Sequence, residues 1–182
     1  MGRSCGQCRR ATKARIRRVN AKSPDNQGVA SSQPIGITID SLCHSSTALA
    51  RGIDNTPPLT LRPNLRRLAS GLESIQALLG SPVIISSGYR GPKLNRIVGG
   101  APESQHQQGL AADFECPTFG EPLQIALAIC ASTIPFDQII LEFGRWVHVS
   151  FAATPRRRAL TIYSSAEGYL DGIVTTMGQR LA

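Results

Sequence analysis

The sequence predicts an α+β fold: a single domain in which helices pack on a mainly antiparallel sheet. Leucine and isoleucine recur at three- and four-residue steps between positions 61 and 79, the spacing of the buried face of an amphipathic helix. Short β-branched segments gather in the second half of the chain without a regular alternation of strand and helix. With 182 residues, the chain is long enough for one well-buried domain.

The first 36 residues differ in composition from the rest. Eight of the 20 Lys and Arg residues lie within residues 1–22, which contain no acidic residue, and the remainder has equal numbers of both signs. Such a segment buries too little apolar surface to offset the entropy lost on ordering. We therefore expect a disordered basic tail over 1–36, a folded domain over 37–175 and a loose C-terminus over 176–182.

The cysteines, the apolar segments and the charge distribution disfavour several classes of protein. The five cysteines are scattered, and although Cys5 and Cys8 have metal-binding spacing, no second pair completes such a site. No apolar run is long enough to span a membrane, and no apolar segment follows the basic start as in a classical signal peptide. The neutral domain and an aromatic content of 5% do not favour specific binding of nucleic acid.

Helices are expected mainly in the first half. Asp40 is expected to cap a short helix that reaches Ala50 and contains His44. A long helix ending at Gly80 presents a core face made of Leu61, Leu65, Leu68, Leu72, Ile75, Leu78 and Leu79. Two shorter helical segments are expected over 93–100 and 122–132. In the second of these, the inward residues are predicted to be Leu123, Ala126, Leu127 and Cys130.

Strands are expected over 83–87, 110–115, 138–143, 146–152 and 160–163, the last of these being the final strand. The third and fourth form an antiparallel hairpin across residues 144–145. Alternation places His148 on the face opposite the apolar Val147 and Val149, and it separates Asp113 from Phe114 in the same way. A histidine and an aspartate on faces away from the core are well placed to line a cleft.

Two imidazoles and one carboxylate can hold zinc at three positions and leave a fourth to water, as in catalytic zinc sites. His106, in an expected loop over 101–108, would join Asp113 and His148 in binding one zinc ion per chain. Imidazole and carboxylate ligands also suit iron or manganese, so the ligand types alone leave the metal open. A free glutamate nearby would accept the proton of the water.

Three motifs occur in order along the chain: Ser86-Ser-Gly-Tyr-Arg90, Ser104-x-His106-x-x-Gly109-x-Ala111-x-Asp113 and Trp146-Val-His148. Over residues 37–173 they resemble the zinc D-alanyl-D-alanine carboxypeptidase family of peptidoglycan peptidases, in particular its small, often phage-associated branch. The resemblance implies that His106, Asp113 and His148 bind zinc. It also implies that Arg90 holds a substrate carboxylate or steadies the oxyanion, although a structural salt bridge would also explain this arginine.

The catalytic base departs from the family pattern. Many members carry the acid three residues before the last histidine, where this chain has Arg145. Glu142 lies six residues before His148, and the related zinc site of Hedgehog signalling domains has a glutamate at the same spacing. We therefore expect Glu142 to be the base. A surface pairing with Arg145 is the other explanation, and Glu115 and Asp137 are weaker candidates for the base.

The resemblance implies that the substrates are peptidoglycan stem peptides, contacted by Arg90, Ser104, Gln107 and Trp146. We expect a monomer that acts at the bacterial cell wall or in the periplasm. The sequence leaves open whether the bond cut is a terminal D-Ala-D-Ala, a cross-link or L-Ala-D-Glu. A zinc-containing module that binds the cell wall or a protein without cutting it is the alternative.

Overall fold

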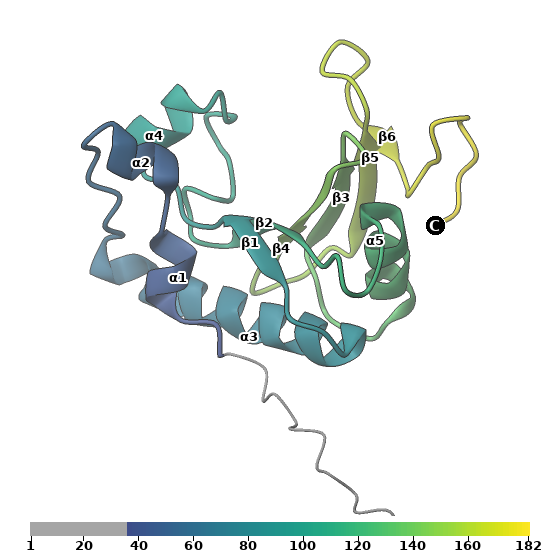
Figure 1. Cartoon of the computed structure of the whole chain (residues 1–182), viewed down its shortest axis with the longest axis horizontal. Helices are drawn as coiled ribbons and strands as arrows, with labels where there is room; N and C mark the ends of the chain where they lie inside the picture. Colours follow the sequence, from purple (N-terminus) through teal and green to yellow (C-terminus); the bar gives the residue numbers. More distant parts are fainter. Residues whose placement is uncertain (1–35) are drawn as a thin grey trace, which may run out of the picture. The chain divides into compact units, whose positions relative to one another are not determined.

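The computed structural model describes residues 36–182, which form an α+β fold around one six-stranded sheet (Figure 1). The strand order is β1-β2-β4-β3-β5-β6, and every neighbouring pair is antiparallel except β3 and β5. In chain order the strands are β1 (Ile84–Ser87), β2 (Ala111–Glu115), β3 (Gln138–Glu142), β4 (Trp146–Ser150), β5 (Arg158–Ile162) and β6 (Leu170–Asp171). The predicted fold class is confirmed.

The helices largely precede the sheet in the chain. They are α1 (Ile39–Cys43), α2 (Ser46–Ala50), a 3-10 helix η1 (Leu59–Leu61), α3 (Arg62–Leu79), α4 (Pro92–Ile97) and α5 (Pro122–Ala131). The single helix expected up to Ala50 is wrong, because the chain becomes extended at His44, with ψ 134°. Thr38 and Ser45 cap the two resulting helices through their side-chain oxygens, whereas Asp40 lies inside the first turn of α1.

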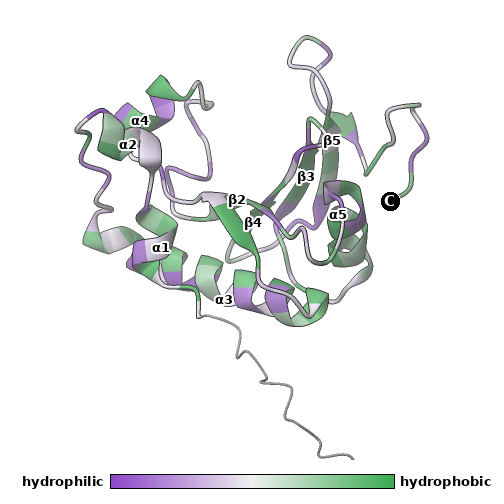
Figure 2. Cartoon of the chain, in the orientation of Figure 1, coloured by the Kyte–Doolittle hydropathy of each residue, from purple (hydrophilic) through white to green (hydrophobic). Residues whose placement is uncertain are grey.

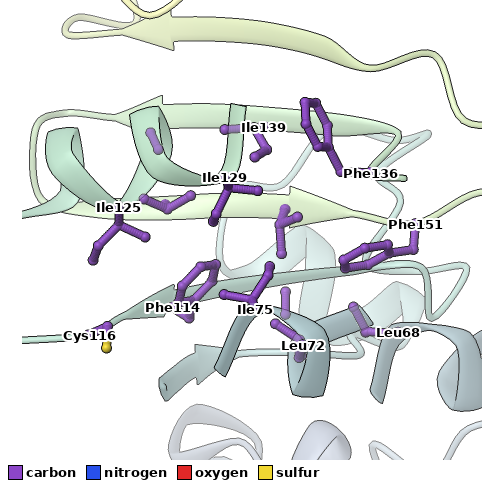
Figure 3. Packing of buried hydrophobic residues seen from close by; sticks show 14 of the residues in the cluster. Leu68, Leu72, Ile75, Phe114, Cys116, Ile125, Ile129, Phe136, Ile139 and Phe151 are labelled. Carbon is purple, nitrogen blue, oxygen red and sulfur yellow. The ribbon is translucent and has the colours of Figure 1, made fainter. Parts of the chain in front are cut away.

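The main core lies between one face of the sheet and the helices α3 and α5. Hydrophobic and hydrophilic residues alternate along α3, as its amphipathic pattern predicts (Figure 2). Figure 3 shows the packing, which involves Leu68, Leu72 and Ile75 of α3, Ile125 and Ile129 of α5, and Phe114, Phe136, Ile139 and Phe151. One predicted detail is wrong, because Leu78 is 42% exposed. On α5, Ala126 is buried as predicted and Leu123, Leu127 and Cys130 pack against the core while partly exposed, but the fully buried Ile125 and Ile129 were not predicted.

Strand alternation decides which side chains leave this core. Val147 and Val149 of β4 are fully buried against the helices, so His148 between them faces the opposite side of the sheet. The register places His148 directly opposite Asp113 of β2 on one side and Ile140 of β3 on the other. The second face of the sheet therefore carries the polar cluster that the sequence predicts.

The C-terminal part contains one strand more than expected. Strand β6 pairs with β5, so the strand expected over 160–163 is not the last. Ile173 is fully buried in the main core. The predicted basic tail lies outside the described residues except for Gly36. Within residues 36–182, no helix combines the length and the apolar character needed to cross a membrane.

Candidate metal centre

His106, Asp113 and His148 meet on the sheet face opposite the main core. Each offers one ligand atom, and these three atoms lie within 4.8 Å of one another. The His106 Nε2 atom is 3.1 Å from both the Asp113 Oδ1 atom and the His148 Nδ1 atom, and the last two atoms are 2.8 Å apart. All three residues are buried. The structure thus brings together the two imidazoles and the carboxylate that the sequence singled out.

The backbone around Gly88 sets the orientation of His106. The His106 Nδ1–H group donates to the Gly88 carbonyl over 2.7 Å, which leaves the Nε2 lone pair directed at the other two ligands. Gly88 has no room for a side chain, because a Cβ there would meet the Leu42 carbonyl oxygen at 2.2 Å. Burial lowers the pKa of His106 despite the neighbouring Asp113, which favours the neutral imidazole that a metal needs.

The two histidines hold Asp113 in its charged form, and Arg90 binds its other carboxylate oxygen. Burial alone would raise the pKa of the Asp113 carboxyl, but the adjacent His106 and His148 outweigh burial and lower it. The Arg90 Nη2 group binds the Asp113 Oδ2 atom, while Arg90 Nε donates to Ser87 Oγ over 2.7 Å. Arg90 therefore orients the carboxylate so that the Oδ1 atom faces the histidines.

The donor set fits a tetrahedral metal ion. With metal–ligand bonds of about 2.0–2.2 Å, two corners of a tetrahedron lie about 3.3–3.6 Å apart. The three separations between ligand atoms, 2.8 to 3.1 Å, are a few tenths of an ångström shorter, so small side-chain movements would admit the ion. These three atoms carry lone pairs and repel one another unless protons lie between them. A metal cation in the space between them would remove this repulsion.

Glu142 lies on the same face of the sheet, one step along from His148. It is paired with Trp146 across the β3–β4 hairpin, whose tight turn has positive φ at Phe143 and Gly144. The Trp146 indole donates to the Glu142 Oε2 atom over 3.1 Å. Burial and the nearby Asp113 raise the pKa of Glu142, with weaker opposing contributions from His148 and others. A carboxyl with a raised pKa suits proton transfer near neutral pH.

The other acidic candidates are placed less favourably. The Asp137 carboxylate accepts two side-chain hydrogen bonds from Arg156 and one from Gln105, which together lower its pKa to about 2 despite burial. Glu115 is exposed at the end of β2 and is not part of the cleft wall. Within the described chain, the carboxylate of Glu142 is bound by Trp146 and not by Arg145.

The metal centre opens into a cleft of about 990 Å³. Of the four residues expected to contact substrate, Arg90, Ser104 and Trp146 line this cleft. The fourth, Gln107, is not among the lining residues, and its amide donates to the Pro102 carbonyl over 2.6 Å.

Sequence reasoning missed several residues of the cleft. Gln105 donates to Asp137 through its amide, and its Oε1 atom is buried without a hydrogen-bond partner among residues 36–182. Tyr169 is 60% exposed beside the cleft, and burial together with Glu142 and Asp113 raises its pKa. The alternation of Arg158, Leu160 and Ile162 along β5 is the signal that could have identified a further part of the wall.

The α+β fold and the buried His-Asp-His group beside a carboxyl with a raised pKa define the class of the metal-dependent hydrolases. A family model described as Peptidase M15 matches residues 36–150, which is more than half of the chain. The chain belongs to this family, whose members are metal-dependent peptidases. A search of curated proteins gave no match.

Proposed function

We propose that the protein is a zinc peptidase that hydrolyses peptide bonds in peptidoglycan stem peptides, as a D-alanyl-D-alanine carboxypeptidase or an endopeptidase. The observation that carries the proposal is the convergence of His106, Asp113 and His148 at a cleft that also holds Glu142. Membership of the Peptidase M15 family supports a peptidoglycan-related substrate. On this proposal the protein works at the cell wall, as a monomer.

Zinc is the metal that this ligand set fits best. Two imidazoles and one carboxylate are a ligand set of catalytic zinc sites. When bound, zinc would polarise the scissile carbonyl and make a water molecule acidic enough to attack it near neutral pH. His106 and His148 would hold the metal through Nε2 and Nδ1, and Asp113 through Oδ1.

Glu142 would accept the proton of the attacking water and return it to the amine that leaves. Its place beside His148 on the cleft face of the sheet supports this role, because diagonal neighbours on adjacent strands lie about 7–8 Å apart. The Trp146 indole holds one carboxylate oxygen, Oε2, and so limits the rotation of the side chain. The Oε1 atom would then face the water.

Arg90 would have two roles, one toward the metal ligand Asp113 and one toward the substrate. Its bonds to Asp113 and Ser87 support a role in fixing the third metal ligand. Because its side chain is still 17% exposed in the cleft wall, the remaining guanidinium N–H groups would hold a substrate carboxylate or the oxyanion. Ser104 and Trp146 would contact the peptide, since both line the cleft.

Digestion of purified peptidoglycan tests the proposal directly. The protein is incubated with the wall before and after removal of metal by a chelator, and again after zinc is restored. Mass spectrometry of the products should show new peptide termini that need zinc, and their identity would distinguish D-Ala-D-Ala, cross-link and L-Ala-D-Glu cleavage. Absence of new termini with zinc fully bound would contradict the proposal and favour a binding module.

A further inference from the structure

The cleft face of the sheet continues beyond the metal centre as an apolar strip that ends in arginine. In the first row across the strands, His148 is followed by Ile140 on β3 and Leu160 on β5. Ile140, Leu160 and Ile162 form an apolar cluster separate from the main core. In the next row, Gln138 lies beside Arg158. All of these residues line the same cleft as the metal ligands.

Two arginines, Arg156 and Arg158, line this end of the cleft. Arg156 forms the stronger ion pair of the two. Arg156 binds the buried Asp137 through two hydrogen bonds of 2.8 and 2.6 Å. Among the described residues, the Arg158 side chain forms one ion pair, of 3.4 Å with Asp171, and both of these side chains are more than half exposed. A long, exposed ion pair of this kind is worth about 0–1 kcal/mol, so another anion can replace Asp171 with little loss.

We propose that Arg158 binds a carboxylate of the substrate, and that the apolar strip between Arg158 and the metal centre receives the alkyl part of the same residue. This inference rests on the proposed peptidase function and names a determinant of its specificity. The chemical class is a peptide with an acidic residue close to the bond that is cut. Arginine suits this task because its planar fork can bind both carboxylate oxygens.

The dimensions of the sheet agree with such a substrate. Strand β5 lies two strand spacings of about 4.8 Å from β4, with β3 between them, and Leu160 is in the same row as His148. Arg158 lies two residues from Leu160 along β5, a distance of about 6.7 Å. The backbones of His148 and Arg158 are therefore about 12 Å apart, which an extended peptide covers in roughly three to four residues. The arginine side chain shortens the remaining gap. A carboxylate one to three residues from the scissile bond would therefore reach Arg158.

Three synthetic stem peptides test the proposal with the full-length, zinc-loaded protein. The first contains a glutamate and a diamino dicarboxylic acid with free carboxylates, and each of the others has one of these carboxylates converted to an amide. The amide peptide that lacks the carboxylate bound by Arg158 should have a kcat/KM about 10-fold lower than that of the acid peptide. The loss should appear mainly as a higher KM, since one charge-assisted hydrogen bond is lost. Arg158→Ala should show the same low kcat/KM on the acid peptide and on that amide peptide.

Two further variants separate a direct contact from a structural effect. Arg158→Lys should recover part of the preference for the acid peptide. Asp171→Asn should strengthen this preference, because it removes the competing carboxylate. Arg66→Ala, on the exposed side of α3, serves as the matched control for the loss of one positive charge and should leave the preference unchanged.

Equal kcat/KM for the wild-type protein on all three peptides would overturn the proposal, as would an unchanged preference in Arg158→Ala. Failure to cleave any of the peptides with zinc bound would contradict the peptidase function instead. Calorimetric titration of the same peptides would still decide the role of Arg158 in that case. The acid peptide should bind more tightly than one of its amides, and Arg158→Ala should abolish the difference.

Discussion

At the scale of the residue, the proposed metal site depends on His148. This side chain supplies one of three converging ligand atoms from the rigid centre of the sheet. We expect His148→Ala to lose most of its bound metal, since two remaining ligands hold zinc poorly. Metal analysis after dialysis of the purified protein checks this expectation. His44→Ala is the control, because His44 is exposed between α1 and α2, and it should keep a full equivalent of metal.

Glu142 lies beside the ligands without belonging to them, so its substitution should separate metal binding from catalysis. Glu142→Gln should keep its zinc and its fold, because the amide can still accept the hydrogen bond from Trp146. The amide cannot accept the proton of the water, so turnover should fall by about 10²–10⁴-fold. Metal content and peptide hydrolysis are measured on the same sample. Wild-type turnover with full metal would exclude Glu142 as the base.

The environment of Glu142 also predicts a dependence on pH. Burial and Asp113 raise its pKa, and on the proposed mechanism Glu142 acts as the base only when it is deprotonated. As the pH falls through this raised pKa, kcat/KM should decrease, and the decrease should begin at a higher pH than the ordinary glutamate value of about 4.3. A pH profile of kcat/KM for the wild-type protein measures the midpoint. An acid limb at or below the ordinary value would contradict the assignment.

At the scale of the element, α3 packs closely against Phe151, the residue that follows β4. Gly71 of α3 packs against Phe151, and a Cβ at Gly71 would lie 2.3 Å from the ring. Alanine favours a helix over glycine by about 0.5–1 kcal/mol, but this overlap forces α3 away from the sheet. We expect overpacking to win, so that Gly71→Ala lowers the free energy of unfolding by about 1–3 kcal/mol.

Urea unfolding of Gly71→Ala and of a matched variant distinguishes the two effects. Ser70→Ala lies next to Gly71 on the exposed side of α3 and should leave stability unchanged or raise it by a few tenths of a kcal/mol, because only helix propensity changes. If Gly71→Ala were as stable as Ser70→Ala, the close packing of α3 on Phe151 would be refuted.

At the scale of the whole molecule, Asp137 joins three separate segments. Its carboxylate binds Arg156 from the β4–β5 connection and Gln105 from the loop that carries His106. The hydrogen bonds from Arg156 lower the pKa of Asp137 from 3.8 to about 2. A lowered carboxyl pKa stabilises the fold above pH 3.8, and this contribution is lost as the pH falls through 2.

Asp137→Asn should therefore lower the free energy of unfolding at pH 7 by about 1–2 kcal/mol, a value reduced because Arg156 is half exposed. The difference from the wild-type protein should shrink between pH 4 and pH 2. Urea unfolding at several pH values measures it. Asp171→Asn, which removes an exposed pair, should change stability by less than about 1 kcal/mol at every pH. A constant penalty for Asp137→Asn would contradict the charge-based explanation.

The basic segment at the start of the chain is the subject of a further prediction, which concerns folding and activity without it. We propose that the folded domain does not need residues 1–35, because residues 36–182 form a six-stranded sheet, a hydrophobic core and the candidate metal centre. A protein that starts at Gly36 should fold and cleave a soluble peptide with unchanged kcat/KM. Its sedimentation with whole cell walls should be weaker at low salt, because the positive tail attracts anionic polymers. Failure to fold would refute the proposal.

Local patterns in the sequence determined much of this protein. The period of the leucines predicts α3 and its end at Gly80, where φ is 61°. Strand alternation predicts that His148 and the neighbouring valines face opposite sides, and motif order predicts which three residues approach each other. These features depend on the geometry of single elements, which residue spacing reports directly.

Only the tertiary structure shows which helices and strands lie next to one another and which of their residues are paired. The register between strands places Arg158 and the apolar strip beside the metal centre, and the fold aligns Arg90 with Asp113. The same reason explains the errors: Leu78 has the right period but is 42% exposed, and the strand expected to be the last is followed by β6, which pairs with β5. Strand pairing, register and burial are set by contacts between residues distant in sequence, and no local spacing records those contacts.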